Sequence, residues 1–330
     1  MSAALMVRSS SLGDVVWALS VAHDIAAARP GLAVDWVAEE AFVALPAMIE
    51  DVRTVVPMAL RRWRREPLAR RTWREAWAFR AALRRERYDA VVDAQEQMKG
   101  AVIARLARGR RHGLDRASIR EPAATWLHDA HHAVPRDLHF ALKCRRLAAM
   151  ALGYAVEGPP RWRWRLPAAP ACTPGRPYVV AAHATSRADK RWPQERWRDL
   201  LAGIGAGGFT IVLPHGSDRE EATSRAWASG LEGAVVPPRL PLDAMAALLA
   251  HAHAVVGVDT GLTHLAAALG TPTLALFTVT DAALAGAAVA GTHARDLGGN
   301  GAVPTVGEAA CGATPSCTKS VPARRRSGAC

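Results

Sequence analysis

The chain has 330 residues, of which 50% are hydrophobic and 22% are charged, and its formal net charge is +12. This composition argues against intrinsic disorder and leaves room for two folded domains of about 150 residues each. No stretch approaches the roughly 18 uncharged apolar residues of a membrane span, and no signal peptide precedes the first strand, so we expect a cytoplasmic protein. The excess positive charge predicts an anionic partner. The five scattered cysteines predict neither a disulfide framework nor a zinc site.

Strands and helices alternate through the first half of the chain. Strands are predicted at 4–8, 33–37, 54–57 and 90–93. Helices are predicted to start at Asp14, near Leu68 and at Gln97. A strand–helix–strand order implies a parallel sheet that is covered by helices on both faces.

An excess of arginine marks residues 61–87. This segment holds eleven arginines against three glutamates, and apolar residues recur between them at three- and four-residue spacing. The spacing predicts a helix that packs one narrow stripe and leaves its other faces in solvent. Charged runs are commonly only solvated surface, but here too few carboxylates are present to neutralise the arginines. The imbalance favours an anion-binding face.

A proline-rich stretch at 159–177 separates this half from a second series of the same kind. We therefore expect an N-terminal domain over 1–158, a linker over 159–177 and a C-terminal domain over 178–289. In the second series, strands are predicted at 178–182, 210–213, 254–258 and 273–277, with helices starting near Pro193, Asp218, Pro241 and Gly261. The glycine- and proline-rich residues 290–330 are expected to form an irregular tail.

The predicted fold class is α/β, with two Rossmann-like domains facing each other across a cleft. Open α/β sheets bind ligands beyond the carboxyl ends of their strands. The functional site is therefore expected in the cleft between the two domains.

The first candidate motif is Ser-Ser-Ser-Leu-Gly-Asp at 9–14, between the first strand and the first helix. Gly13 permits a tight turn, and the serines offer hydroxyl groups and helix caps. Asp14 would lie in the first helical turn, where the helix dipole stabilises a negative charge. Aspartate at such a position is commonly only a cap, so the spacing by itself leaves both roles open.

The second candidate motif is Val-Asp-Thr-Gly-Leu-Thr-His at 258–264, again between a strand and a helix. Free N–H groups at a helix start, together with Thr260 and a flexible Gly261, suit a phosphate or pyrophosphate. His264 would point back toward the same anion. The alternative is an Asp259 cap followed by an ordinary glycine turn.

Two further loops follow strands of the second series. At 183–193 the side chains of Thr185, Ser186 and Lys190 are suited to clamping a diphosphate. At 214–221, Glu220 is placed to accept hydrogen bonds from a ribose. Both loops are also compatible with plain helix starts.

Several motifs are missing from the sequence. The chain has no G-x-x-x-x-G-K-[ST] loop and no G-x-G-x-x-G at the first helix, which argues against an ATPase or a dinucleotide oxidoreductase. It also lacks a D-x-D pair in a predicted loop. We therefore expect no metal and no cofactor at the site.

Taken together and in order, eight segments resemble glycosyltransferase family 9, the lipopolysaccharide heptosyltransferases. They are SSSLGDVV (9–16), DWVAEEAF (35–42), RRWRR (61–65), YDAVVDAQ (88–95), REP (120–122), ALGY (151–154), HATSRADKRWP (183–193) and VDTGLTHLAAAL (258–269). The resemblance covers roughly residues 4–285 and implies a GT-B fold. It also implies inverting transfer of L-glycero-D-manno-heptose from ADP-heptose to the first Kdo sugar of Kdo2-lipid A, at the cytoplasmic face of the inner membrane.

The resemblance implies a role for each matching residue. Asp14 is the expected general base, and Lys190 is expected to stabilise the charge on the departing ADP. The donor-binding residues are expected to be Thr185, Ser186, Lys190, Glu220, Asp259, Thr260, Gly261 and His264. The acceptor-binding residues are expected to be Ser10, Gly13, Arg61, Arg62, Arg64, Arg65 and Arg120. Trp63, Trp73 and Trp77 are expected at the membrane interface.

Three alternatives stay open at this point. The enzyme could add the second heptose instead of the first, or the chain could bind the nucleotide sugar without turnover, because its tail lacks the apolar repeat that the family has there. Its charge also raises the question of nucleic-acid binding. No aromatic RNA platform, zinc finger or helix-turn-helix pattern is present, so we expect no nucleic-acid partner.

Overall fold

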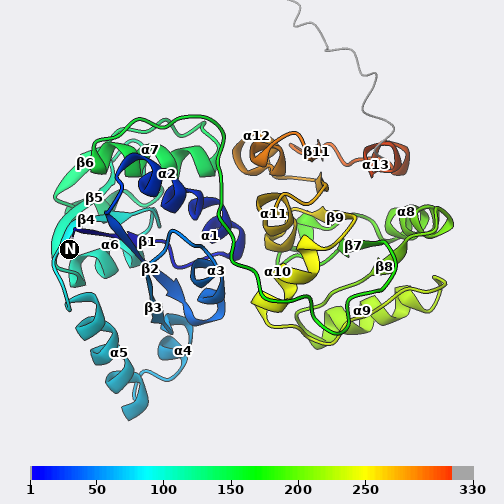
Figure 1. Ribbon diagram of the computed structural model, residues 1–330, viewed down its shortest axis with the longest axis horizontal. Coiled ribbons are helices and arrows are strands. Elements are labelled where there is room, and N and C mark those ends of the chain that lie inside the picture. The colour runs from blue at the N-terminus through cyan, green and yellow to red at the C-terminus, as the bar shows by residue number, and fades with distance from the viewer. Residues whose placement is uncertain (1, 314–330) are drawn as a thin grey trace, which may run out of the picture.

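A computed structural model describes residues 2–313 of the protein. Two α/β lobes lie side by side, and helix α1 of the first faces helix α11 of the second (Figure 1). The helices are α1 (Leu12–Ala18), α2 (Ser20–Ala28), α3 (Ala44–Ala47), α4 (Leu60–Arg65), α5 (Arg70–Leu83), α6 (Met98–Leu106), α7 (Phe140–Leu152), α8 (Gln194–Ala206), α9 (Asp218–Ala228), α10 (Leu242–Ala250), α11 (Gly261–Ala268), α12 (Ala282–Ala285) and α13 (Val306–Ala313). No helix within the described range is long and apolar enough to cross a membrane.

A six-stranded parallel sheet organises the first lobe, which we call the N-terminal domain. Its strands are β1 (Ala3–Val7), β2 (Ala33–Glu39), β3 (Thr54–Met58), β4 (Tyr88–Asp93), β5 (Gly109–Leu114) and β6 (Ala130–His132). They lie in the order β3-β2-β1-β4-β5-β6. Alternate residues of β1 enter different cores, because Ala4 and Met6 pack with α1, α2 and α7 while Leu5 and Val7 pack with α5 and α6. The central strand is therefore buried on both faces.

A five-stranded parallel sheet organises the second lobe, which we call the C-terminal domain. Its strands are β7 (Tyr178–Ala182), β8 (Thr210–Val212), β9 (Ala254–Val258), β10 (Thr273–Phe277) and β11 (Ala294–Gly298). They lie in the order β11-β10-β9-β7-β8. Val179 and Ala181 of β7 pack with α8, α9 and α13, whereas Val180 faces α10 and α11.

The predicted strands and helix starts agree with the observed ones within about two residues, but three strands were missed. β5 reads Gly-Arg-Arg-His-Gly-Leu, β6 reads Ala-His-His and β11 reads Ala-Arg-Asp-Leu-Gly. Each lies at or near a sheet edge, where partial exposure permits polar residues and weakens the apolar pattern. The pattern along the chain therefore gave no signal for these strands.

The expectation of an irregular tail is wrong for residues 294–298 and 306–313, which form β11 and α13. β11 pairs in parallel with β10, and α13 packs on α8 with Ala309 fully buried. These contacts are tertiary, so a segment with a weak local pattern acquires regular structure from its neighbours. Cys144 and Cys172 are free thiols. The remainder of the expected tail, 314–330, lies outside the described residues.

The segment between α7 and β7 connects the two domains and is fixed to both of them. The indole N–H of Trp162 donates to the carbonyl oxygen of Val16, and that of Trp164 donates to the carbonyl oxygen of Ala268. A further contact joins the domains directly, because a ring nitrogen of His139 lies 3.0 Å from the carbonyl oxygen of Gly286. These hydrogen bonds join the two domains to each other and to the connecting segment.

Candidate active site

One amide side chain, that of Gln95, makes several hydrogen bonds to the loop that follows β1. Oε1 of Gln95 accepts hydrogen bonds from the N–H and the hydroxyl of Ser9, each at 2.9 Å. Nε2 of Gln95 donates to the carbonyl oxygen of Ser10, also at 2.9 Å. Gln95 is buried at the carboxyl end of β4, next to β1 in the sheet. The serine loop therefore approaches α1 along one defined path.

Asp14 closes the first turn of α1. Its Oδ2 accepts hydrogen bonds from the backbone N–H and the hydroxyl of Ser11, at 3.1 and 2.9 Å. The same oxygen lies 2.6 Å from Nη2 of Arg8, whose side chain is buried, while the Asp14 side chain is 38% exposed. Oδ1 has no hydrogen-bond partner among the residues the structure describes. Asp14 is thus both the cap that its position predicted and a carboxylate with one free oxygen.

Electrostatics keep Asp14 ionised. Desolvation in the pocket raises the pKa of this carboxyl group, but the charge of Arg8 and the hydrogen bonds from Ser11 and Arg8 lower it by more. The net pKa lies below the ordinary value for aspartate. The carboxylate can therefore accept a proton at neutral pH.

A pocket of about 370 Å³ opens beside Asp14, and its lining holds four cations together with the carboxylate of Glu96, which is paired with Lys143. Ser10 and Arg120, both predicted, line it together with Lys99 and Lys143, which the sequence did not single out. Nζ of Lys99 donates to the hydroxyl of Ser10 at 2.8 Å. Burial, together with the charges of Arg8 and Arg61, lowers the pKa of the Lys99 ammonium. This chemistry suits an anionic ligand next to the Asp14 carboxylate.

The four predicted arginines of α4 are in different environments. Arg62 is half-buried and lies 2.9 Å from the carboxylate oxygens of both Glu40 and Glu75, so the structure pairs it within the protein instead of leaving it free for a ligand. Arg61 lies over the ring of Phe42 and is close enough to influence Lys99. Arg64 and Arg65 are exposed. Of these four arginines, Arg61 is the one whose charge is seen to lower the pKa of Lys99 in the Asp14 pocket.

Gly13 has a packing role that the expectation of acceptor binding did not include. A Cβ atom at Gly13 would lie 2.5 Å from Cδ2 of His264, and one at Gly261 would lie 2.2 Å from the side chain of Leu12. Both distances are shorter than any real Cβ contact. The two glycines let α1 and α11 meet, which brings Asp14 next to the start of α11.

On the C-terminal side, Asp259 holds two of the predicted donor residues. Its Oδ2 lies 2.6 Å from Nζ of Lys190, which ends a short 3-10 helix (Ala188–Lys190), and its Oδ1 lies 3.2 Å from Nε2 of His264. Burial raises the pKa of Asp259, but His264 and Lys190 together hold it well below the usual range. His264 also packs against Trp17, with ring centroids 5.2 Å apart. The structure therefore gives His264 a carboxylate partner, not the free, anion-facing position expected for it.

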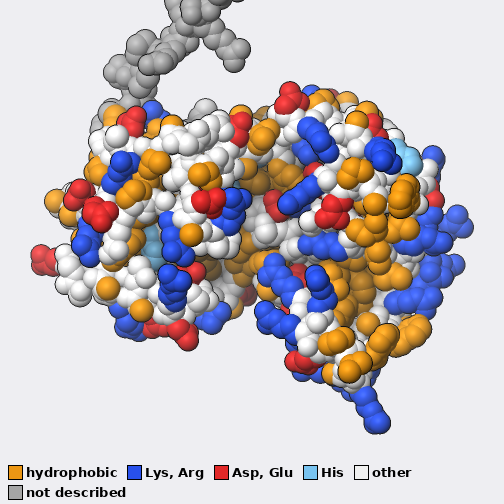
Figure 2. Space-filling model, turned by 180° about the vertical axis from the view of Figure 1, so that it is seen from behind, with side chains coloured by type: hydrophobic (Ala, Val, Ile, Leu, Met, Phe, Trp, Pro, Cys, Tyr) orange, Lys and Arg blue, Asp and Glu red, His pale blue; other side chains and the backbone are white. Residues whose placement is uncertain are grey.

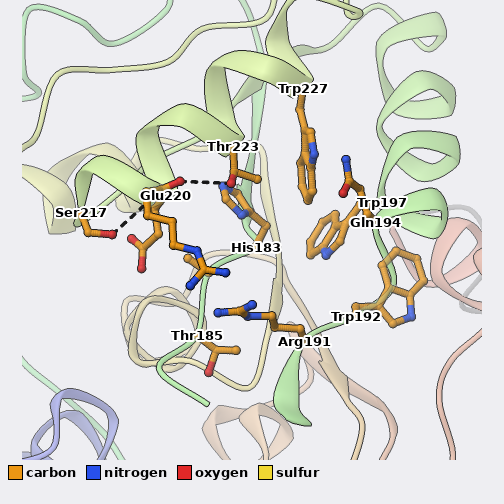
Figure 3. Close-up of a pocket in the computed structure, with 12 residues that line it drawn as sticks. His183, Thr185, Arg191, Trp192, Gln194, Trp197, Ser217, Glu220, Thr223 and Trp227 are labelled. Carbon is orange, nitrogen blue, oxygen red and sulfur yellow. Dashed lines mark hydrogen bonds between the residues drawn. The ribbon is translucent and has the colours of Figure 1, made fainter. Parts of the chain in front are cut away.

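A second pocket of about 370 Å³ lies between the loop after β7 and the start of α9 (Figure 3). Thr185 and Arg191 come from the loop, and Ser217 and Glu220 face them from α9 and its N-cap. Glu220 accepts a hydrogen bond from the N–H of Gly216 at 2.7 Å. The hydroxyl of Thr185 donates to the carbonyl oxygen of Asp259, so this pocket adjoins the Asp259 cluster. Arg191, a further cation of the 183–193 loop, also lines this pocket.

The remaining predicted donor residues lie along the same edge of the sheet. Ser186 is exposed in the loop after β7, and Thr260 is the N-cap of α11, with a hydroxyl that makes no capping hydrogen bond. Backbone N–H groups at the start of α11 are thus available to an anion. Within residues 2–313, no group of three or more His, Cys, Asp or Glu side chains is arranged to hold a metal ion.

The chain is similar in sequence and in fold to known proteins of one family. Residues 76–296 match glycosyltransferase family 9 (heptosyltransferase). The chain is 39% identical over 290 residues to lipopolysaccharide heptosyltransferase 1 of Escherichia coli strain K12, covering 86% of this chain and 89% of that protein. The solved structure of E. coli heptosyltransferase WaaC with ADP matches with a TM-score of 0.83 at 35% identity, covering 92% of this chain and 97% of that one. With ADP-2-deoxy-2-fluoro heptose, WaaC matches with a TM-score of 0.81 at 35% identity, covering 93% and 97%.

Proposed function

The chain belongs to glycosyltransferase family 9, and from this membership we propose that it transfers L-glycero-D-manno-heptose from ADP-heptose to the first Kdo sugar of Kdo2-lipid A. It is a glycosyltransferase with the GT-B fold. The proposal rests on the surroundings of Asp14. Its carboxylate lines a pocket that also holds cations, and the residue before it, Gly13, packs against His264 of the C-terminal domain. The contact between Gly13 and His264 supports a reaction at the junction of the two domains.

We propose that Asp14 is the general base of an inverting displacement. The acceptor hydroxyl loses its proton to Oδ1 of Asp14 as its oxygen forms a bond to the anomeric carbon of heptose. The bond from that carbon to the phosphate oxygen breaks, and its electron pair leaves with ADP. A base of low pKa suffices when the hydroxyl becomes acidic only late in an oxocarbenium-like transition state.

The leaving diphosphate needs positive charge on the opposite wall. Lys190, the start of α11 at Thr260 and Gly261, and the loop residues Thr185 and Ser186 would supply cations, N–H groups and hydroxyls. Because Lys190 is paired with Asp259, the diphosphate would draw this ammonium away from an existing partner. Asp259 and His264 would then act by orienting Lys190. Glu220 would hold the adenosine ribose from the adjoining pocket.

On the acceptor side, the carboxylates of Kdo would bind the cations around Asp14. Lys99 and Arg120 line the pocket itself, and Arg61 is near enough to influence Lys99. Arginine binds carboxylates and phosphates through two parallel hydrogen bonds, and lysine binds them through its compact positive charge. The more distant Arg64 and Arg65 would meet the lipid A phosphates.

Catalysis on a lipid acceptor would take place at the membrane surface, so we propose peripheral association of the face around α5. Leu68, Trp73 and Trp77 are 91%, 59% and 60% exposed, whereas Trp63 donates its indole N–H to Glu75 and is unavailable. Figure 2 shows hydrophobic and basic side chains together at the end of the N-terminal domain that carries α5. The fraction of protein that co-sediments with phosphatidylglycerol vesicles should fall in the Trp73→Ala/Trp77→Ala variant. Trp126→Ala, at another exposed tryptophan, is the matched control.

A competition between acceptors tests the function. The enzyme is offered ADP-heptose with equal amounts of Kdo2-lipid A and its singly heptosylated product. We expect heptose on Kdo2-lipid A; transfer only to the heptosylated acceptor would assign the second-heptose reaction instead. Calorimetric binding of ADP-heptose without any transfer would contradict enzymatic function and favour a binding protein.

A further inference from the structure

Arg8 stands at the centre of the contacts around Asp14. It is the first residue after β1 and is only 5% exposed. Nη2 lies 2.6 Å from Oδ2 of Asp14, and Nη1 donates to the carbonyl oxygen of Ala94 at 2.7 Å. The guanidinium carbon lies 4.4 Å from the ring centroid of Phe140, the first residue of α7. Three elements of the N-terminal domain thus fix one cation.

The position of the guanidinium leaves it little freedom. The backbone carbonyl oxygen of Arg8 accepts a hydrogen bond from the indole N–H of Trp36 at 3.0 Å, and this bond holds Arg8 at the end of β1. A buried cation is unfavourable without a partner, and within the described chain the only carboxylate paired with Arg8 is that of Asp14. The pair is therefore a fixed feature of the pocket wall, unlike an exposed ion pair whose side chains move freely.

We propose that Arg8 is a positioning residue for the transfer step, which holds Oδ2 of Asp14 so that Oδ1 alone faces the acceptor hydroxyl. This inference rests on the proposed function of Asp14. Ser11 and Arg8 occupy Oδ2 from two sides, and the pocket opens toward the remaining oxygen. The proton of the acceptor hydroxyl is therefore transferred to Oδ1 of Asp14. After transfer, the neutral acid at Asp14 lies beside a guanidinium that no longer has an opposite charge next to it, which favours release of the proton from Oδ1 to solvent and restores the carboxylate.

The pKa of Asp14 agrees with this role. The charge of Arg8 is the largest of the effects that lower it, and it opposes desolvation, which raises it. Without Arg8, desolvation still raises the pKa of Asp14, but the charge that lowers this pKa most is lost, so the pKa of Asp14 rises. The base is then protonated, and inactive, up to a higher pH. Loss of Arg8 should accordingly move the acidic limb of the pH–rate profile upward.

The first test compares Arg8→Met with Arg8→Lys by measuring kcat/KM for Kdo2-lipid A against pH. For Arg8→Met we expect the acidic limb to move up by more than about one pH unit, and the plateau kcat to fall by about tenfold. Arg8→Lys keeps the charge and should hold the limb close to that of the wild type. The KM for ADP-heptose should not change in either variant. An unmoved limb in Arg8→Met overturns the inference.

A matched control is Arg53→Met, which breaks another arginine–aspartate pair of the same domain, Arg53 with Asp35. It should cost stability without moving the limb. A second comparison uses Asp14→Asn and the Arg8→Met/Asp14→Asn double variant. If Arg8 acts through Asp14, Arg8→Met causes no further loss of kcat in the Asp14→Asn background. Full additivity of the two losses would show a merely structural role and overturn the inference.

A third readout does not require activity. A carboxyl group with a lowered folded-state pKa stabilises the protein above its unfolded pKa, and this contribution disappears as the pH falls through the folded pKa. The gap in melting temperature between wild type and Arg8→Met should therefore shrink between about pH 6 and pH 3. A pH-independent gap contradicts the inference. A wild type that transfers no heptose would contradict the proposed function alone, because this readout would still report on Arg8.

Discussion

The N-terminal domain carries positive charge in two regions that differ in burial. Residues 61–87, around α4 and α5, hold eleven arginines, most of them exposed. The pocket beside Asp14 is lined by four cations: Arg8 is buried, Lys99 and Lys143 are half-buried, and Arg120 is exposed at its edge. Arg8 and Lys99 are held by hydrogen bonds within the domain. Exposed charges more than about 10 Å from a ligand are largely screened at physiological salt, whereas fixed charges in a pocket are not. We infer that chemistry depends on the few fixed cations and that attachment depends on the many exposed ones.

The largest change in the acceptor KM should come from replacing the cations of the Asp14 pocket. We expect Lys99→Met and Arg120→Met each to raise the acceptor KM by about tenfold or more, since a hydrogen bond to a charged group contributes about 1.5–3 kcal/mol. The KM for ADP-heptose should stay constant. Arg116→Met, at an exposed site outside the pocket, is the control. Because the pKa of Lys99 is lowered, its contribution in the wild type should also fade as the pH rises toward that pKa.

Charge reversal on α4 should have a smaller effect that depends on salt. For Arg61→Glu/Arg64→Glu we expect the acceptor KM to rise by up to about tenfold at low ionic strength, and by less at high salt, because the arginines are exposed. Steady-state kinetics at two salt concentrations would measure this. Equal increases in the donor and acceptor KM would refute an acceptor role for these arginines.

The smallest effect is expected at Arg62. Its ion pairs with Glu40 and Glu75 make it a structural partner, so Arg62→Gln should change the acceptor KM by less than about twofold and lower the melting temperature slightly. Kinetics and thermal unfolding of the same preparation measure both. A tenfold rise in acceptor KM would show that Arg62 leaves its carboxylates to bind the substrate.

The sequence predicted the parts of the fold that depend on local pattern. Buried strands such as Tyr178–Ala182 are continuous apolar runs, and helix starts at Asp218 and Gly261 follow recognisable caps and turns. The strands β5, β6 and β11, which lie at or next to a sheet edge, lack such a pattern because polar residues stand among their apolar ones. Their structure depends on pairing with neighbours far along the chain.

The same limit applies to the site. The motif around Asp14 was visible, but the role of Gln95, 85 residues from Ser10, exists only once β1 and β4 are neighbours. Arg8 and Lys99 likewise gain their roles from burial and not from their spacing. Conversely, the density of arginine drew Arg62 into the predicted site, because a count of charges cannot show that two carboxylates already neutralise one of them.

The central claim is that Asp14 is the base, and single-turnover transfer by Asp14→Ala tests it most directly. Calorimetry with ADP is done on the same sample, and Asp14→Asn serves as the variant that retains an oxygen for Arg8 to bind. We predict that heptose transfer to Kdo2-lipid A slows by about 100-fold or more while the affinity for ADP is nearly unchanged. Transfer at more than about a tenth of the wild-type rate, with intact ADP binding, would contradict the claim.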